Sequence, residues 1–448
     1  MERRGIWGWM LFDWANQPFY TLILTFIFAP YFADIVAPDA VTGQALWADF
    51  VLYGSLAVAF LAPVLGAIAD QTGPRKPWIA VFSLMFVIGC SGLWWAEPGT
   101  GDLFWIGAAF LLAFVGSEFA LIFVNAMLPD LAPRSETGRI SGSGWAMGYA
   151  GGVAVLVVVL LLIAPAPGQE VTLLGLAPLF GLDPALGEPA RATGPLTALW
   201  FVVFALPFFL YTRDAPRVAR RPGVVGRGLR GLGRTLVDLP NHGDLLRFLV
   251  AALFYRDGLA ALFAFGGIYA SGVLAWQTFE LGVFGIVAAL TGAVGAWLGG
   301  RADKAFGPKP VVMTSIVVLI AVCIVTLSTS RSSVLFMPIA DGSTLPDLVF
   351  YICGGLLGAT AGSVQAASRT LLIHQAEGRI PMTEAFGLYA LAGKATAFIG
   401  PLLIGLATRA FDSQQLGITP VVVLFLVGLI LLAPVRSRDV EQEREAFP

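Results

Sequence analysis

Long apolar runs separated by short polar connections make up nearly the whole chain. A bilayer core of ~30 Å requires about 20 apolar residues per helix. Twelve segments meet that length: 7–36, 46–69, 77–96, 103–128, 140–164, 195–212, 246–273, 277–299, 309–328, 347–366, 381–407 and 417–434. The pattern predicts an all-α polytopic membrane protein with twelve transmembrane helices.

Basic residues fall in every second connection. Of the 27 Lys and Arg residues, 22 lie at the two termini or in connections on one side, here called the basic face. The opposite side has Arg191, Arg331 and Arg409. Positively charged connections stay in the cytoplasm, so we expect both termini to be cytoplasmic, in a bacterial inner membrane.

The longest connection, 213–245, is rich in Gly, Pro and Arg and is too poor in apolar residues to form its own core. We interpret it as a cytoplasmic linker, with recruitment of anionic lipid as the alternative. The predicted organisation is an N-terminal six-helix bundle (1–212), the linker (213–245), a C-terminal six-helix bundle (246–435) and a cytoplasmic tail (436–448).

Two connections repeat one pattern. "GAIADQTGPRKP" (66–77) follows the second span and "GGRADKAFGPKP" (299–310) follows the eighth. Parallel six-helix repeats are the architecture of the major facilitator fold. An aspartate there can cap a helix start or pair with a basic residue, as a latch that opens during transport. The candidate gating residues are Gly66, Asp70, Gly73, Arg75, Lys76, Asp303 and Lys304.

Several stretches resemble the vacuole-effluxer family of the major facilitator superfamily. They are "FDWANQPFYTLILTFIFAPYF" (12–32), "NAMLPDLAP" (125–133), "GRISGSGWAMGYAGG" (138–152), "GSVQAASR" (362–369) and "EAFGLYALAGKATAFIGPLLIG" (384–405). The resemblance implies the facilitator fold, and it implies amino-acid export, in which the family's best-known member is implicated.

Charged residues inside the predicted spans are the candidate substrate or coupling sites, because a charge at mid-bilayer costs about 2.5–3.5 kcal/mol. In the first half, Asp13 and Asn16 share one helix face, as do Glu118 and Asn125. We expect Asp13 and Asn125 at similar depth near the cytoplasm, with Glu118 about 10 Å deeper than Asn125. Asp13 is interpreted either as a structural carboxylate near the cytoplasmic gate or as part of the substrate or proton path, and Glu118 as a proton carrier.

The second half contributes Arg256 and Asp257 in span 7 and Lys394 in span 11. Arg256 and Asp257 are adjacent in sequence and therefore about 100° apart on a helix, so structural pairing with another helix is as reasonable as substrate binding. Lys394 is interpreted as a ligand for an anionic group. Gln365 in span 10 is a further candidate, although amides there more often hold helices together.

Composition excludes several classes of protein. Only 12% of residues are charged, against about 25% in soluble proteins. The three cysteines lie inside apolar runs, and the two histidines fit no metal spacing. The chain has no phosphate-binding loop and no catalytic constellation. We therefore expect no enzyme activity, cofactor, metal or nucleic-acid partner.

These features predict a secondary transporter that works by alternating access, as a monomer, on a small-molecule substrate. Carboxylates in the first half and cations in the second suit a zwitterion such as an amino acid, with protons or sodium as coupling ions. An ion-coupled carrier of sugars or organic anions is the alternative within transport. A receptor or scaffold that moves nothing is the alternative from another class.

The orientation can be tested by labelling single cysteines in intact cells. A cysteine that replaces Asp39 should react with an impermeant thiol reagent, whereas one that replaces Arg227 should react only after the cells are opened, because position 227 is predicted to be cytoplasmic. Labelling of position 227 from outside would overturn the orientation.

Overall fold

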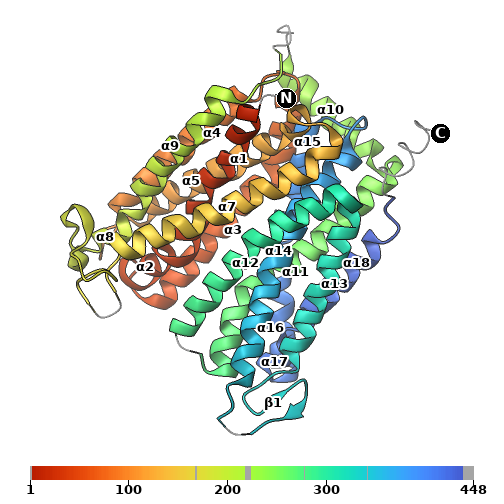
Figure 1. Ribbon diagram of the computed structural model, residues 1–448. Coiled ribbons are helices and arrows are strands. Elements are labelled where there is room, and N and C mark those ends of the chain that lie inside the picture. The colour runs from red at the N-terminus through yellow and green to blue at the C-terminus, as the bar shows by residue number, and fades with distance from the viewer. Residues whose placement is uncertain (1–2, 167–168, 217–222, 277, 341, 437–448) are drawn as a thin grey trace. The chain divides into compact units, whose positions relative to one another are not determined.

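The computed structural model describes residues 3–166, 169–216, 223–276, 278–340 and 342–436 (Figure 1). These residues are almost all helical, with a short hairpin of β1 (Ser333–Val334) and β2 (Met337–Pro338). Ten helices in the described part are long and apolar enough to cross a membrane. The other two predicted spans correspond to α11 and to the pair α15 and α16. The predicted all-α fold is confirmed.

Contacts divide the chain into two compact units. Unit 1 comprises Met1–Ala62, Gln71–Leu131 and Met147–Pro222, and unit 2 comprises Pro63–Asp70, Ala132–Ala146 and Gly223–Pro448. Unit 2 thus includes the end of the second span and the start of the fifth. The domain bounds expected from the sequence remain a prediction.

The first six predicted spans correspond to helices before residue 213. They are α1 (Arg3–Pro18) with its continuations η1 (Phe19–Phe26), α2 (Phe28–Tyr31) and η2 (Phe32–Val36); α3 (Ala40–Asp70); α4 (Lys76–Gly92) with η3 (Leu93–Trp95); α5 (Leu103–Ala126); α7 (Arg134–Leu162); and α9 (Thr193–Tyr211). Short helices in the connections are α6 (Leu128–Leu131), η4 (Leu179–Gly181), η5 (Pro184–Leu186) and α8 (Glu188–Arg191).

The second half follows the same plan. Its helices are α11 (Gly243–Leu274), α12 (Thr278–Phe306), α13 (Pro308–Leu327), α14 (Leu345–Ala376), α15 (Met382–Lys394), α16 (Ile399–Phe411), α17 (Gln414–Gly417) and α18 (Thr419–Leu432). Helices α12 and α14 run side by side (Figure 1). Their backbones are so close that a Cβ on Gly358 would lie 2.0 Å from the carbonyl oxygen of Ala288.

Two spans depart from regular α-helix. The first widens into π-helical turns directly after Pro18, where the amide of Ile27 donates to the carbonyl of Leu22. The eleventh, expected as one span at 381–407, is divided into α15 and α16 at residues 395–398. Pro401 falls in the first turn of α16, where its missing N–H breaks no helical hydrogen bond. Wide turns and breaks within spans often mark functional sites.

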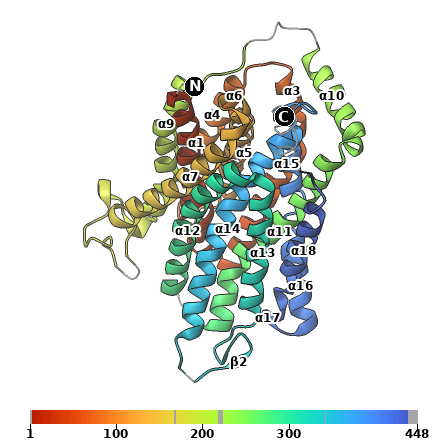
Figure 2. The same ribbon diagram turned by 45° about the vertical axis from the view of Figure 1, so that its right-hand side comes forward.

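Part of the linker is also helical. Helix α10 (Val224–Asp238) is strongly amphipathic and continues through η6 (Leu239–Asn241) into α11. Its Leu232 is buried, and its Gly228 packs against the backbone of Ile68 at the end of α3. Figure 2 shows α10 beside the end of α3. The linker therefore has regular structure that its composition did not reveal.

Candidate functional site

In unit 1, hydrogen bonds fix how the first span lies against α5. The indole Nε1 of Trp9 donates to the carbonyl oxygen of Val124 (2.8 Å), and Nδ2 of Asn16 donates to Oγ of Ser117 (2.9 Å). The helices are antiparallel, so this register places Asp13 at the level of Ala120. Asn125 lies five residues beyond Ala120, toward the C-terminal end of α5, and is level with Gly8. From the sequence we expected Asn125 and Asp13 at the same depth, and this expectation is wrong.

A continuous polar network surrounds this pairing. The hydroxyl of Tyr20 donates to Oε1 of Glu118 (3.0 Å) and lies 3.4 Å from the hydroxyl of Ser117. The single hydroxyl proton of Ser117 can be donated either to the hydroxyl of Tyr20 or to Oδ1 of Asn16 (3.1 Å). Asn16 and Ser117 are fully buried, whereas Tyr20 and Glu118 are half-buried. The network therefore links a buried amide to a carboxylate that retains some access.

Asp13 and Asn125 lie beside this network. Asp13 is 8% exposed, and α7 packs on it through Gly148, whose missing Cβ would lie 3.6 Å from the Cβ of Asp13. The amide oxygen of Asn125 is buried and has no hydrogen-bond partner among the described residues. Asp13 and Glu118, two residues apart in the register, thus lie at nearly the same depth. This corrects the deeper position that we expected for Glu118 relative to Asp13.

In unit 2, the guanidinium of Arg256 is held against α15. Its Nη1 donates to the carbonyl oxygen of Tyr389 (2.7 Å), and its Cζ lies 4.2 Å from the centre of the Tyr389 ring. A Cβ on Gly393 would lie 2.2 Å from that Cζ, so only glycine leaves room for the guanidinium. Cation–π stacking and a charged hydrogen bond together stabilise this half-buried cation.

Asp257 and its neighbour Arg256 make different contacts: Arg256 binds Tyr389, whereas Asp257 lies near Thr396. Asp257 is 1% exposed, and neither carboxylate oxygen accepts a hydrogen bond from another described residue. The side chain of Thr396 approaches the carboxylate, but its hydroxyl donates to the carbonyl of Ala392 (3.4 Å). Thr396 belongs to the break between α15 and α16. A buried carboxylate therefore lies beside the interrupted span.

Lys394 is the last residue of α15, immediately before the break, and is half-buried. Gln365 is half-buried on α14, three residues before Ser368, whose hydroxyl pairs with that of Tyr255 (2.7 Å). Both candidates from the sequence therefore lie within helices of unit 2. The sequence did not single out Tyr389 and Gly393, because only the packing of two helices brings them to Arg256.

The gating residues of the first repeated connection divide into two groups. Asp70 belongs to unit 2, where its Oδ2 accepts a hydrogen bond from the backbone amide of Glu384 (2.9 Å) in the first turn of α15. Gly66, one turn earlier, packs directly on the carbonyl of Thr383. Asp70 therefore caps a helix start, which is one of the two roles that the sequence left open.

The remaining residues of that connection, which belong to unit 1, make different contacts. Gly73, with a φ of 86°, turns the chain after α3. The backbone amides of Arg75 and Lys76 donate to the carboxylate of Asp214 (2.8 and 2.9 Å), and the Arg75 side chain pairs with Asp130 (2.6 Å). These residues fix the start of α4 and the end of α9.

The second repeated connection mirrors the contact of Asp70. Asp303 is buried, and a Cβ on Gly138 of α7 would lie 2.4 Å from its carboxylate carbon. Lys304 pairs with Glu136, which also accepts a hydrogen bond from Nε of Arg139 (2.6 Å). Each aspartate at the end of a span thus lies against the start of a span from the other half. The two helix starts share the pattern Pro-x-Ser/Thr-Glu, at 133–136 and 381–384.

Comparison with known proteins gives a consistent result. Residues 49–445 match the family model described as vacuole effluxer Atg22 like. A Bacillus subtilis (strain 168) protein named "Uncharacterized MFS-type transporter YxiO" is 23% identical over 98% of this chain and 97% of its own length. Autophagy-related protein 22 of Coccidioides immitis (strain RS) is 23% identical over 69% of this chain and 51% of its own. The chain spans about half the length of the fungal relatives that it matches.

Solved structures of other transporters resemble this chain in fold. The human organic anion transporter MFSD10 is 15% identical, with a TM-score of 0.69 and coverage of 96% of this chain and 99% of that one. The major facilitator transporter FucP, in an outward conformation, is 14% identical, with a TM-score of 0.70 and coverage of 98% and 99%. At these identities the likeness establishes the major facilitator fold, as predicted.

The cap at α15 can be tested by Asp70→Ala in a protein that carries Thr383→Cys. Thr383 is fully buried, so its thiol should react only when this contact opens. Loss of a hydrogen bond to a charged group costs about 1.5–3 kcal/mol, so labelling should accelerate about 10- to 150-fold.

The matched control is Asp238→Ala, which removes an exposed carboxylate from α10 in the same unit and should leave the labelling rate unchanged. An unchanged rate in Asp70→Ala would show that the cap does not hold these helices together.

Proposed function

We propose that this chain, which belongs to the vacuole effluxer Atg22-like family, is a secondary transporter that exports small zwitterions by alternating access. The family description and the major facilitator fold support transport. The more specific part of the proposal depends on one observation: the first half holds two carboxylates inside its spans, Asp13 and Glu118, whereas the second half holds two cations, Arg256 and Lys394, offset by the carboxylate of Asp257.

The first half supplies carboxylates. Glu118 accepts a hydrogen bond from Tyr20 and keeps partial access, whereas Asp13 is almost fully buried under α7. A carboxylate that has both a hydrogen-bond donor and a route to water can take up and release a proton. We assign proton coupling to Glu118 and a structural or gating role to Asp13.

The second half supplies cations. Arg256 is already held by Tyr389, whereas Lys394 ends its helix at a break in the span. Interrupted transmembrane helices commonly form ligand sites in transporters. In this proposal Lys394 binds the carboxylate of the substrate, and Arg256 adds to the positive electrostatic potential. A zwitterion carries both an ammonium group, which a carboxylate can bind, and a carboxylate, which a cation can bind.

A carrier of simple organic anions would use the same cations. That carrier could also use Glu118 for proton coupling, but it gives the carboxylates of the first half no cationic group of the substrate to bind, so we favour the zwitterion. The latch is assigned to Asp70 and Asp303, because each lies against a helix start from the other half of the sequence. The basic face is taken as cytoplasmic, following the positive-inside rule.

Glu118→Gln should abolish flux driven by a pH gradient but preserve exchange of substrate across proteoliposomes. Glutamine keeps an acceptor oxygen for Tyr20 but cannot carry a proton. Asp13→Asn should slow both kinds of flux, because a gate contact serves every cycle. Asp102→Asn, an exposed carboxylate before α5, is the control and should change neither. Undiminished pH-driven flux in Glu118→Gln would place the proton elsewhere.

Lys394→Ala should raise the dissociation constant of an amino-acid substrate about 10- to 150-fold, as expected for the loss of one charged hydrogen bond. The folded fraction, measured by size-exclusion chromatography, should stay near that of the original protein. Arg409→Ala removes an exposed cation from α16 and serves as the control. Unchanged affinity would remove Lys394 from the site, and loss of folding would indicate a structural ion pair instead.

A further inference from the structure

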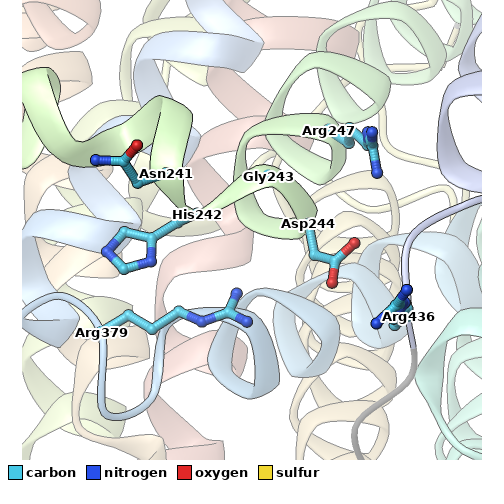
Figure 3. Close-up of a pocket in the computed structure, with 7 residues that line it drawn as sticks. All are labelled: Asn241, His242, Gly243, Asp244, Arg247, Arg379 and Arg436. Atoms are coloured by element: carbon cyan, nitrogen blue, oxygen red, sulfur yellow. The ribbon is translucent and has the colours of Figure 1, made fainter.

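A cavity of about 480 Å³ opens at the start of α11 in unit 2, and none of its lining residues is among the candidate charges of the spans. Three arginines from separate segments converge on it (Figure 3): one from the first turns of α11, one from the connection after α14 and one from the end of α18. The lining residues are Asn241, His242, Gly243, Asp244, Arg247, Arg379 and Arg436.

A buried amide holds two sides of this cavity in place. Gln375, which is fully buried, accepts a hydrogen bond from Nη1 of Arg379 at its Oε1 (3.3 Å), and its Nε2 donates to the carbonyl oxygen of Arg436 (2.8 Å). Nη1 of Arg379 also donates to the carbonyl oxygen of Gln375 (3.2 Å). The convergence of the arginines is therefore built into the fold and does not depend on flexible surface side chains alone.

The charge of the cavity is strongly positive. Three guanidinium groups face one carboxylate, Asp244, which points toward Arg436 in Figure 3. Arg247 and Arg436 are exposed, and neither forms an ion pair with another described residue. The N-terminus of α11, a helix of 32 residues, adds backbone amides and a partial positive charge at the same wall.

We propose that this cavity binds a phosphate group, carried either by an anionic lipid headgroup or by a soluble phosphate compound. The planar guanidinium donates paired hydrogen bonds that match phosphate oxygens. Amides at a helix N-terminus bind the same group.

The neighbouring helix favours the lipid as the source. Helix α10 leads into the cavity wall through η6 and exposes Val225, Leu229 and Leu236 on one side. An amphipathic helix with exposed apolar residues next to a basic pocket is typical of a segment that lies at the membrane surface.

The test uses the purified full-length protein and two probes. Binding of phosphatidylglycerol relative to phosphatidylcholine is measured by native mass spectrometry, and binding of inorganic phosphate is measured as a thermal shift relative to chloride at equal ionic strength. The variants are Arg379→Gln and the double variant Arg247→Gln/Arg436→Gln, whose two side chains are exposed and should not be needed for folding. Arg409→Gln, at the other end of unit 2, is the charge-matched control.

Both cavity variants should weaken phosphatidylglycerol binding about tenfold or more, whereas Arg409→Gln should not. Asp244→Asn, which removes the opposing carboxylate, should strengthen binding. The same pattern with inorganic phosphate but not with the lipid would assign the cavity to a soluble phosphate compound. Equal affinity of all variants for both probes, in protein that elutes as folded, would overturn the proposal.

Discussion

The hydrocarbon interior imposes the constraint on which this structure depends: a charge inside it must have partners, a cavity or a function. The described residues meet the constraint by different means in the two halves. Glu118 has a phenol donor, Arg256 has an aromatic ring and a carbonyl, and Asp257 lies beside an interrupted helix. These charges lie next to the π-helical turns of the first span and the break of the eleventh. Irregular backbone and charge therefore occur together, as a transport path requires.

On the basic face, too, a small number of polar contacts satisfies groups that would otherwise lack partners. The helix starts at residues 134 and 382 leave backbone amides without helical partners, and an aspartate at the end of a span from the other repeat lies against each. Such contacts are short and charged, yet few in number, so a modest free energy can break them. Contacts that are strong but few suit a latch that opens and closes. The contact of α12 with α14 is different, because glycines bring the two backbones so close that it can loosen only if two long helices separate.

The sequence was sufficient to predict the fold and the family, because apolar run length, alternating basic connections and repeated motifs are local signals. It also singled out the charged residues of the polar clusters, but not their neutral partners Tyr20 and Ser117. It could not give the depth of Asp13 relative to Asn125 and Glu118. The sequence prediction estimated the depth of each residue from where its apolar run begins or ends. In the structure, the register of the first span against α5 is set by the hydrogen bonds of Trp9 with Val124 and of Asn16 with Ser117. Tyr389 and Gly393 have no signal of their own, since their importance lies in holding a side chain from another helix. The regular structure of α10 was hidden by its high content of Gly and Arg.

The central claim is that zwitterion transport is coupled to protons through charges held inside the spans. The most direct measurement uses proteoliposomes that contain a pH-sensitive dye and no imposed ion gradient, to which a mixture of amino acids is added on one side. Coupled transport predicts that the inward amino-acid gradient moves protons and changes the internal pH, and that a proton ionophore abolishes this change. Amino-acid uptake with no change of internal pH would contradict the coupling, and the absence of both from folded, reconstituted protein would contradict the assignment of the substrate.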